Sequence, residues 1–184
     1  MVHRLERSCA RFRIVKFLIF ISIFMVALAV PGFTQDKHAP MKPVSITEIS
    51  VEVEGGKSLK MTAAELAKLR RIEVKAKDHD GVEATYSGFE LRDILAPAGA
   101  KLGKELRGPN IAQYLVATAA DGYHAVYSLT ELDRDFTDKI VILADKRDGR
   151  SLENIGPWQL IATNEKKHAR WVRQVTALKV KIAK

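Results

Sequence analysis

Hydrophobic and polar residues alternate over several short stretches of this chain, which is the pattern of half-buried β-strands. The clearest alternation covers residues 44–54 and ends at a pair of turn-forming glycines; residues 72–76 repeat it. Apolar runs rich in β-forming residues predict the remaining strands, at 114–120, 123–127, 140–144, 158–162 and 171–182. The pattern therefore predicts a domain dominated by strands.

Helical signals are short by comparison. Thr62 and Glu65 have the spacing of a capping box and predict a helix that reaches Leu69. Apolar spacing predicts a second short helix over residues 89–95, and Ser128 begins another capping-box pattern. Strands joined by short helices, without long helical periods, predict an α+β domain built around a mixed sheet.

The N-terminus has the composition of a secretory signal peptide. Residues 1–16 are basic, residues 17–30 form an apolar run, and small residues precede Pro31. We expect a signal peptide over 1–35, a flexible lead-in over 36–43 and one domain over 44–184. An uncleaved membrane anchor is the alternative, although the run is shorter than the roughly 20 residues of a spanning helix.

Export has a consequence for cofactor loading. No adjacent arginine pair precedes the apolar run, so the leader is not of the twin-arginine type that serves folded cargo. This favours the general export route, in which the chain crosses the membrane unfolded and carries no preloaded cofactor. The expected location is the periplasm or the exterior of the cell.

Charge and cysteine content narrow the chemistry. The formal net charge is +8, and about half of it lies in the leader; the rest is spread along the domain. Such a distribution indicates solvation, with an anionic ligand as the alternative, and no nucleic-acid-binding motif occurs. The single cysteine is Cys9, inside the leader. The domain therefore has no disulfide and no thiolate metal site.

Four short motifs lie in predicted turns or at strand ends, where side chains can face a ligand. They are Asp121-Gly122-Tyr123, Asp148-Gly149, Gly156-Pro157-Trp158 and Arg170-Trp171. In order and spacing they resemble the molybdopterin-binding oxidoreductase domain, the catalytic domain of sulfite-oxidase-type enzymes. The resemblance covers residues 44–182. It implies that family's α+β fold, molybdopterin as the cofactor to consider, and a ligand cleft lined by Asp121, Tyr123, Asp148, Gly149, Trp158 and Arg170.

The sequence departs from the family where the metal would bind. In those enzymes a cysteine precedes a segment similar to residues 86–91 of this chain, so it would fall between Ala76 and His79, where no cysteine occurs. His79 is a weak metal candidate, because it lies in an Asp-His-Asp-Gly sequence that is good turn chemistry by itself. Trp158 or Gln159 also stands where the family has an arginine that receives an oxyanion.

Each motif also has a structural interpretation. The Asp-Gly pairs at 121 and 148 are typical hairpin turns without any ligand. The basic segment 166–170 can grip a phosphate or can be a solvated loop, and Trp171 is expected to pack in the core. Tyr123, like Tyr86 and Tyr127, can stack on a ring or donate a hydrogen bond.

Two functional classes follow. The first is a non-catalytic or accessory module that binds a small or anionic molecule, or a protein partner, on an enzyme scaffold. The alternative is a sulfite-oxidase-type oxidoreductase subunit that holds molybdopterin without a cysteine ligand. The missing thiolate, the missing twin arginines and the missing substrate arginine favour the first. Membrane association is expected only with an uncleaved leader.

Overall fold

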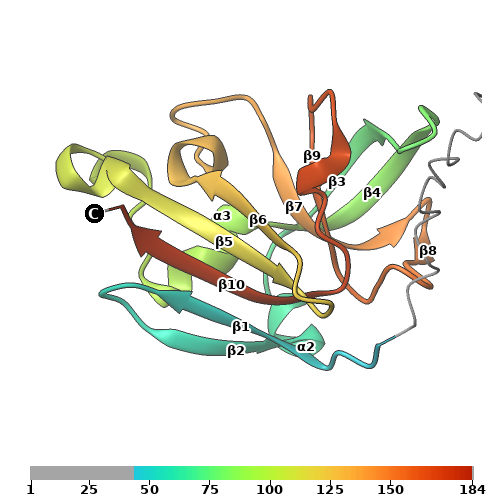
Figure 1. Cartoon of the computed structure of the whole chain (residues 1–184), viewed down its shortest axis with the longest axis horizontal. Helices are drawn as coiled ribbons and strands as arrows, with labels where there is room; N and C mark the ends of the chain where they lie inside the picture. The colour runs from blue at the N-terminus through green and yellow to red at the C-terminus, as the bar shows by residue number, and fades with distance from the viewer. Residues whose placement is uncertain (1–43, 184) are drawn as a thin grey trace, which may run out of the picture. The chain divides into compact units, whose positions relative to one another are not determined.

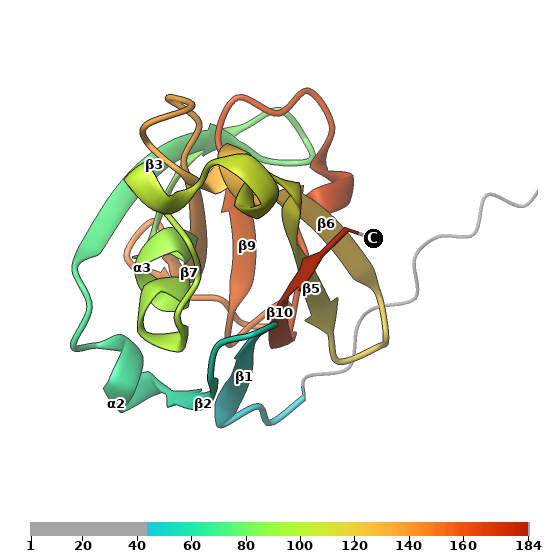
Figure 2. The same cartoon turned by 90° about the vertical axis from the view of Figure 1, so that its left-hand side faces the viewer.

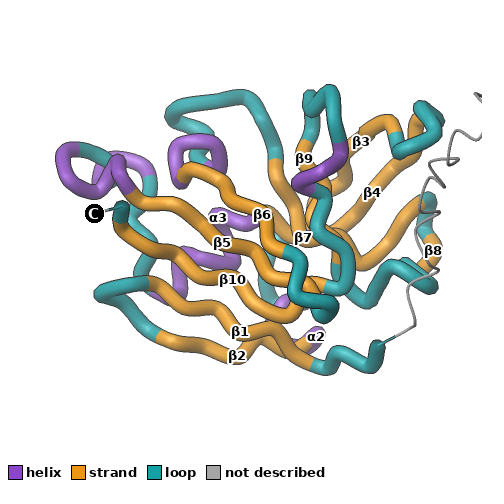
Figure 3. The backbone as a smooth tube through the Cα atoms, in the orientation of Figure 1, coloured by secondary structure: helices purple, strands orange, loops and turns teal. Residues whose placement is uncertain are grey.

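The computed structural model describes residues 44–183, and the predicted signal peptide and lead-in lie outside this range. Strands are the main regular elements of the described chain, and helices are confined to short pieces (Figures 1 and 3). None of the helices in the described part has the length and apolarity needed to cross a membrane. The predicted α+β class is confirmed, with two sheets in place of one.

The first sheet is mixed and has the order β2-β1-β10-β5-β6. Its parallel pair joins β1 to β10, whereas the other neighbours are antiparallel. Strict alternation of buried and half-buried residues in β1 and β5 gives this sheet one face toward the core. The strands are β1 (Glu48–Val53), β2 (Ser58–Thr62), β5 (Gln113–Ala119), β6 (His124–Ser128) and β10 (Val175–Ile182).

The second sheet is antiparallel, with β3, β4 and β7 side by side and two short strands on the far side of β7. The strand β9 pairs with the first half of β7, and β8 pairs with its end. The strands are β3 (Arg71–Lys77), β4 (Glu83–Glu90), β7 (Val141–Arg147), β8 (Arg150–Ser151) and β9 (Gln159–Ala162).

The two sheets are joined where the chain passes from β9 to β10. Val172 accepts a backbone hydrogen bond from Leu160, and Val175 donates one to Trp158, at 2.8 and 3.1 Å. Strands β7 and β9 lie on one side of the core, and β5 and β10 on the other (Figure 2). Buried side chains of both sheets form a single hydrophobic cluster.

Short helices close the ends of the sheets. The helix α3 buries Leu91, Ile94 and Leu95 in the core. The remaining helical pieces are single turns. The α-helices of the described chain are α2 (Ala63–Leu66) and α3 (Leu91–Leu95). The 3-10 turns are η1 (Ala96–Ala98), η2 (Gly103–Glu105), η3 (Gly108–Ala112), η4 (Leu129–Leu132) and η5 (His168–Arg170).

The element boundaries correct several predictions. The capping box is confirmed, because the Thr62 hydroxyl accepts from the amide of Glu65 at 3.3 Å, but the helix ends at Leu66. The predicted helix over 89–95 begins only at Leu91, since the preceding two residues extend β4 and pair with β7. Ser128 caps a 3-10 turn by accepting from Thr130.

Two further corrections concern strands. β2 was not predicted, because the alternation of Ser58–Thr62 is only five residues long, and its pairing with β1 specifies it. The strand predicted over 171–182 begins at Val175, because η5 and an irregular turn occupy the residues before it.

Candidate functional site

The residues predicted to line a ligand cleft occupy three different places. Asp121, Tyr123 and Arg170 lie together beside β6. Asp148 and Gly149 form the hairpin between β7 and β8. The sixth, Trp158, is 4% exposed and packs in the hydrophobic core.

Tyr123 connects the β5–β6 hairpin to η5. Its amide donates to the Asp121 carboxylate at 2.9 Å, which closes the hairpin turn. Its hydroxyl donates to the carbonyl of Ala169 at 2.6 Å, and 49% of the residue is exposed. The predicted tyrosine is therefore available to solvent along its ring while its hydroxyl is engaged in an internal bond.

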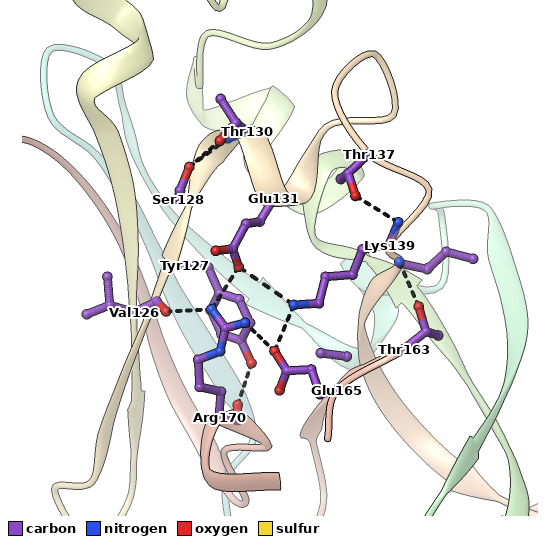
Figure 4. A network of polar contacts seen from close by, with 12 residues as sticks. Val126, Tyr127, Ser128, Thr130, Glu131, Thr137, Lys139, Thr163, Glu165 and Arg170 are labelled. Atoms are coloured by element: carbon purple, nitrogen blue, oxygen red, sulfur yellow. Dashed lines mark hydrogen bonds and ion pairs between the residues drawn. The ribbon is translucent and has the colours of Figure 1, made fainter. Parts of the chain in front are cut away.

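Arg170 is surrounded by acceptors (Figure 4). Its Nη1 donates to Glu131 at 2.7 Å and to the carbonyl of Val126 at 3.2 Å, and its Nη2 pairs with Glu165. Its guanidinium carbon lies 4.5 Å from the centre of the Tyr127 ring. Desolvation lowers the pKa of Arg170, but the bonds to both glutamates outweigh it and raise the pKa overall. An anion could reach this guanidinium only by displacing a carboxylate.

Lys139 completes the network around Arg170. Its ammonium lies 2.8 Å from Glu165 and 3.9 Å from Glu131 (Figure 4). Two carboxylates and two cations therefore balance in charge. The Glu165 side chain is 7% exposed, and its Oε2 has no hydrogen-bond partner among the described residues. No sequence signal linked Glu131, Lys139 and Glu165 to one another, because they come from separate turns and meet only in the fold.

Asp148 and Gly149 have the left-handed conformation of a tight hairpin, with φ of 48° and 76°. The Asp148 carboxylate accepts a hydrogen bond from the amide of Thr85 at 2.9 Å. This gives Asp148 a structural role on β4, although 58% of its side chain remains exposed. The predicted turn is confirmed.

The turn between β3 and β4 lies where the metal-binding cysteine of the resembled family would fall. Asp78 accepts from the amides of Asp80 and Val82, both at 2.9 Å, and forms an ion pair with Arg147. His79 is 82% exposed and lies 3.6 Å from the Asp80 carboxylate. Among residues 44–183, no three histidine, cysteine, aspartate or glutamate side chains gather as they would around a metal.

An aromatic pair lies between this turn and η5. Tyr86 and Trp171 meet edge to face with centroids 5.6 Å apart, and both are buried. The Trp171 indole donates to the carbonyl of Ala162 at 3.2 Å, and His168 packs 4.2 Å from its ring. Burial raises the pKa of Tyr86, although nearby Arg147 opposes the shift. Trp171 thus packs in the core, as predicted.

Gln159 brings an unsatisfied acceptor to the same face of the second sheet. Gly88, Ala144 and Gln159 are directly opposite one another in β4, β7 and β9, two residues along β4 from Tyr86. A Cβ on Gly88 would lie 2.1 Å from the Leu143 carbonyl, so the strands approach closely here. Gln159 is 5% exposed, and its Oε1 accepts no hydrogen bond from a described residue.

An acceptor of this kind is costly. A buried carbonyl without a donor destabilises a fold by about 1–3 kcal/mol. A bound molecule with an N–H group would remove that cost. Gln159 was noted in the sequence only as a replacement for an arginine, and its burial became visible only in the fold.

Comparison with protein-family models and with curated proteins finds no match. Among solved structures, the chain is similar to the sulfane dehydrogenase SoxCD from Paracoccus pantotrophus, with a TM-score of 0.58 and 18% identity. The match covers 75% of this chain but only 39% of the SoxCD chain. At this identity the likeness concerns the fold. The α+β domain predicted from the motifs is thus a fold that a dehydrogenase chain also uses.

Proposed function

We propose that the chain is an exported binding module that uses an oxidoreductase-type scaffold to hold a small molecule without redox chemistry. One observation carries the proposal: residues 44–184 contain no cysteine. Nothing in the domain can therefore supply the thiolate that holds the metal in the enzymes that the motifs resemble. The expected export rests on the composition of residues 1–35.

The remaining donors do not fit that metal either. Asp78 is already neutralised by Arg147, and the exposed His79 has only the Asp80 carboxylate beside it. Oxygen and imidazole donors favour harder cations over a high-valent metal that needs soft sulfur ligands. The chemistry of the donor set therefore argues against a thiolate-type molybdenum centre.

The surroundings of Tyr86 support a ligand of definite chemistry. Gln159 offers a buried acceptor, which suits an N–H donor on the ligand. Arg173 is half-buried, acts electrostatically on Tyr86 and forms no ion pair with a described residue, so it can bind an acidic group. Tyr86 and Trp171, which pack edge to face and are both buried, place apolar ring edges nearby. The proposed ligand is a small heterocycle with a ring N–H and a negative charge.

A thermal-shift screen of the full chain tests binding, with acidic pterins and purines as probes. A molecule that binds the folded state must raise the midpoint of unfolding. Gln159→Leu is expected to abolish that rise while making the ligand-free protein as stable as wild type or more so, because the unpaired acceptor is removed. Gln113→Leu is the matched control, since Gln113 is equally buried but donates to Asn110. It should destabilise the fold and leave the ligand-induced rise intact.

Metal analysis of protein purified from its native compartment separates this proposal from the alternative. Stoichiometric molybdenum with turnover of an oxo donor or acceptor would support an oxidoreductase subunit and overturn the binding module. The dehydrogenase chain with a similar fold is the reason to make this measurement. Native mass spectrometry of the same sample would identify any bound heterocycle directly.

A further inference from the structure

The segment from Asn164 to Arg170, here called the strap, connects two anchored parts of the core. Ala162 at the end of β9 is 1% exposed, and Trp171 after the strap is 8% exposed. Every residue of the strap itself is exposed or half-exposed. The strap therefore contributes no fully buried apolar side chain to the core.

Polar side-chain contacts, together with the packing of His168 on Trp171, attach the strap to the rest of the domain. The hydroxyls of Tyr123 and Tyr127 donate to the carbonyls of Ala169 and Arg170. The Arg170 guanidinium reaches Val126 and Glu131 on β6 and η4, and Lys139 holds Glu165 (Figure 4). Among the described residues, no backbone amide of the strap donates to a neighbouring strand.

Two features make the attached state less favourable than the number of contacts suggests. Glu165 Oε2 is buried and accepts no hydrogen bond from a described residue, which costs free energy in a low-dielectric environment. Asn164, at the start of the strap, has a left-handed φ of 60°, a conformation that turns the chain sharply. Segments held by few apolar contacts open at lower free energy than the core around them.

We propose that the strap opens as one unit while β9 and Trp171 stay in place, and that Arg170 is the latch that holds it closed. Opening removes His168 from its packing against Trp171 and uncovers the aromatic pair on which the proposed function rests. The strap is thus a gate to that site. Its opening belongs to the ligand-free protein, so it can be tested without knowing the ligand.

Hydrogen exchange of the full chain, followed by mass spectrometry, tests the gate. The amides of Trp171 and Val172 report opening, because they donate to the strap carbonyls of His168 and Arg170, both at 2.9 Å. Peptides that contain these two amides are expected to exchange at least about tenfold faster than those of β5 and β10, because they open locally. The double variant Tyr123→Phe, Tyr127→Phe should accelerate exchange of these amides alone and increase acrylamide quenching of Trp171. Tyr114→Phe is the matched control, because this half-buried tyrosine of β5 pairs with Ser128 and Lys181, outside the strap, and it should change neither readout.

Protection of the Trp171 and Val172 amides equal to that of β10 in the wild-type protein would overturn the gate. So would an equal acceleration of these amides and those of β10 in the double variant, since the strap would then open only with the whole domain. If the double variant does not fold, Arg170→Lys replaces it, because lysine cannot reproduce the forked contacts of the guanidinium. A ligand screen that fails would leave these exchange results unaffected, whereas slow strap exchange would leave the ligand proposal standing.

Discussion

Asp148 and Thr85 exchange two hydrogen bonds across the end of the second sheet. The Asp148 amide donates to the Thr85 carbonyl at 2.7 Å, and the Thr85 amide donates to the Asp148 carboxylate at 2.9 Å. The side chain thereby replaces the backbone carbonyl that a continuing strand would present after the pairing of Tyr86 with Arg147. Asp148, which the motif spacing predicted to contact a ligand, thus stabilises the β7–β8 hairpin.

Two substitutions of Asp148 separate the contribution of its carboxylate from that of its left-handed backbone conformation. Asp148→Ala should destabilise the domain by about 1–2 kcal/mol, because the Thr85 amide loses its acceptor and alanine is strained at a left-handed φ. Asp148→Asn keeps a carbonyl oxygen and suits that conformation, so it should cost less than half as much. Urea unfolding of the two variants measures the difference. Equal losses would mean that the bond to Thr85 contributes nothing.

The lowered pKa of Asp78 predicts that the free energy of unfolding decreases in acid. Desolvation raises the pKa of Asp78, but hydrogen bonds from the Val82 amide, Arg147 and the Asp80 amide together lower it below the ordinary 3.8. The unfolded state therefore binds the proton more readily, and stability falls as pH decreases through about 4 toward the lower folded pKa. Asp78→Asn should remove part of this slope in urea unfolding between pH 6 and pH 3. An unchanged slope would show that other carboxylates dominate acid unfolding.

The sequence could predict elements whose signal is local. Alternation specified β1 and β3, the Asp-Gly pairs specified two hairpins, and Thr62 specified the start of α2. It failed where pairing decides the structure. The segment Ser58–Thr62 becomes a strand because β1 lies beside it.

The site was less predictable because its contacts join distant parts of the chain. Arg170 was identified as a ligand residue from its neighbours in sequence, but its partner Glu131 is 39 residues away. Likewise, Arg147 meets Asp78 across 69 residues. A cation in a motif shows that charge is present, and only the fold shows whether a carboxylate already neutralises it.

The raised pKa of Tyr127 predicts that the free energy of unfolding decreases in alkali. Burial raises its pKa above the ordinary 10.0, and nearby Glu165 raises it further, whereas Arg170 opposes the shift. The folded state keeps the proton that the unfolded state loses, so this contribution is complete below pH 10 and falls as pH rises above it. Tyr127→Phe should flatten the loss of stability between pH 9 and pH 11, measured by urea unfolding. Tyr114→Phe serves as the control, and an equal flattening there would contradict the assignment to Tyr127.

The pair of Arg170 with Glu165 should be coupled more strongly than a surface ion pair. Glu165 is 7% exposed, so removing Arg170 leaves a buried carboxylate with Lys139 as its remaining cation. A double-mutant cycle with Arg170→Met and Glu165→Gln is expected to give a coupling of about 1–3 kcal/mol.

The reference for that cycle is the ion pair of Lys60 with Glu48, whose side chains are 75% and 41% exposed. Solvent screening limits such pairs to less than about 1 kcal/mol, so the same cycle there should give a smaller coupling. Unfolding in 1 M salt sharpens the contrast, because salt weakens the exposed pair more than the buried one. Equal couplings at the two places would mean that the Arg170 network is solvated, and the latch that the strap requires would then be absent.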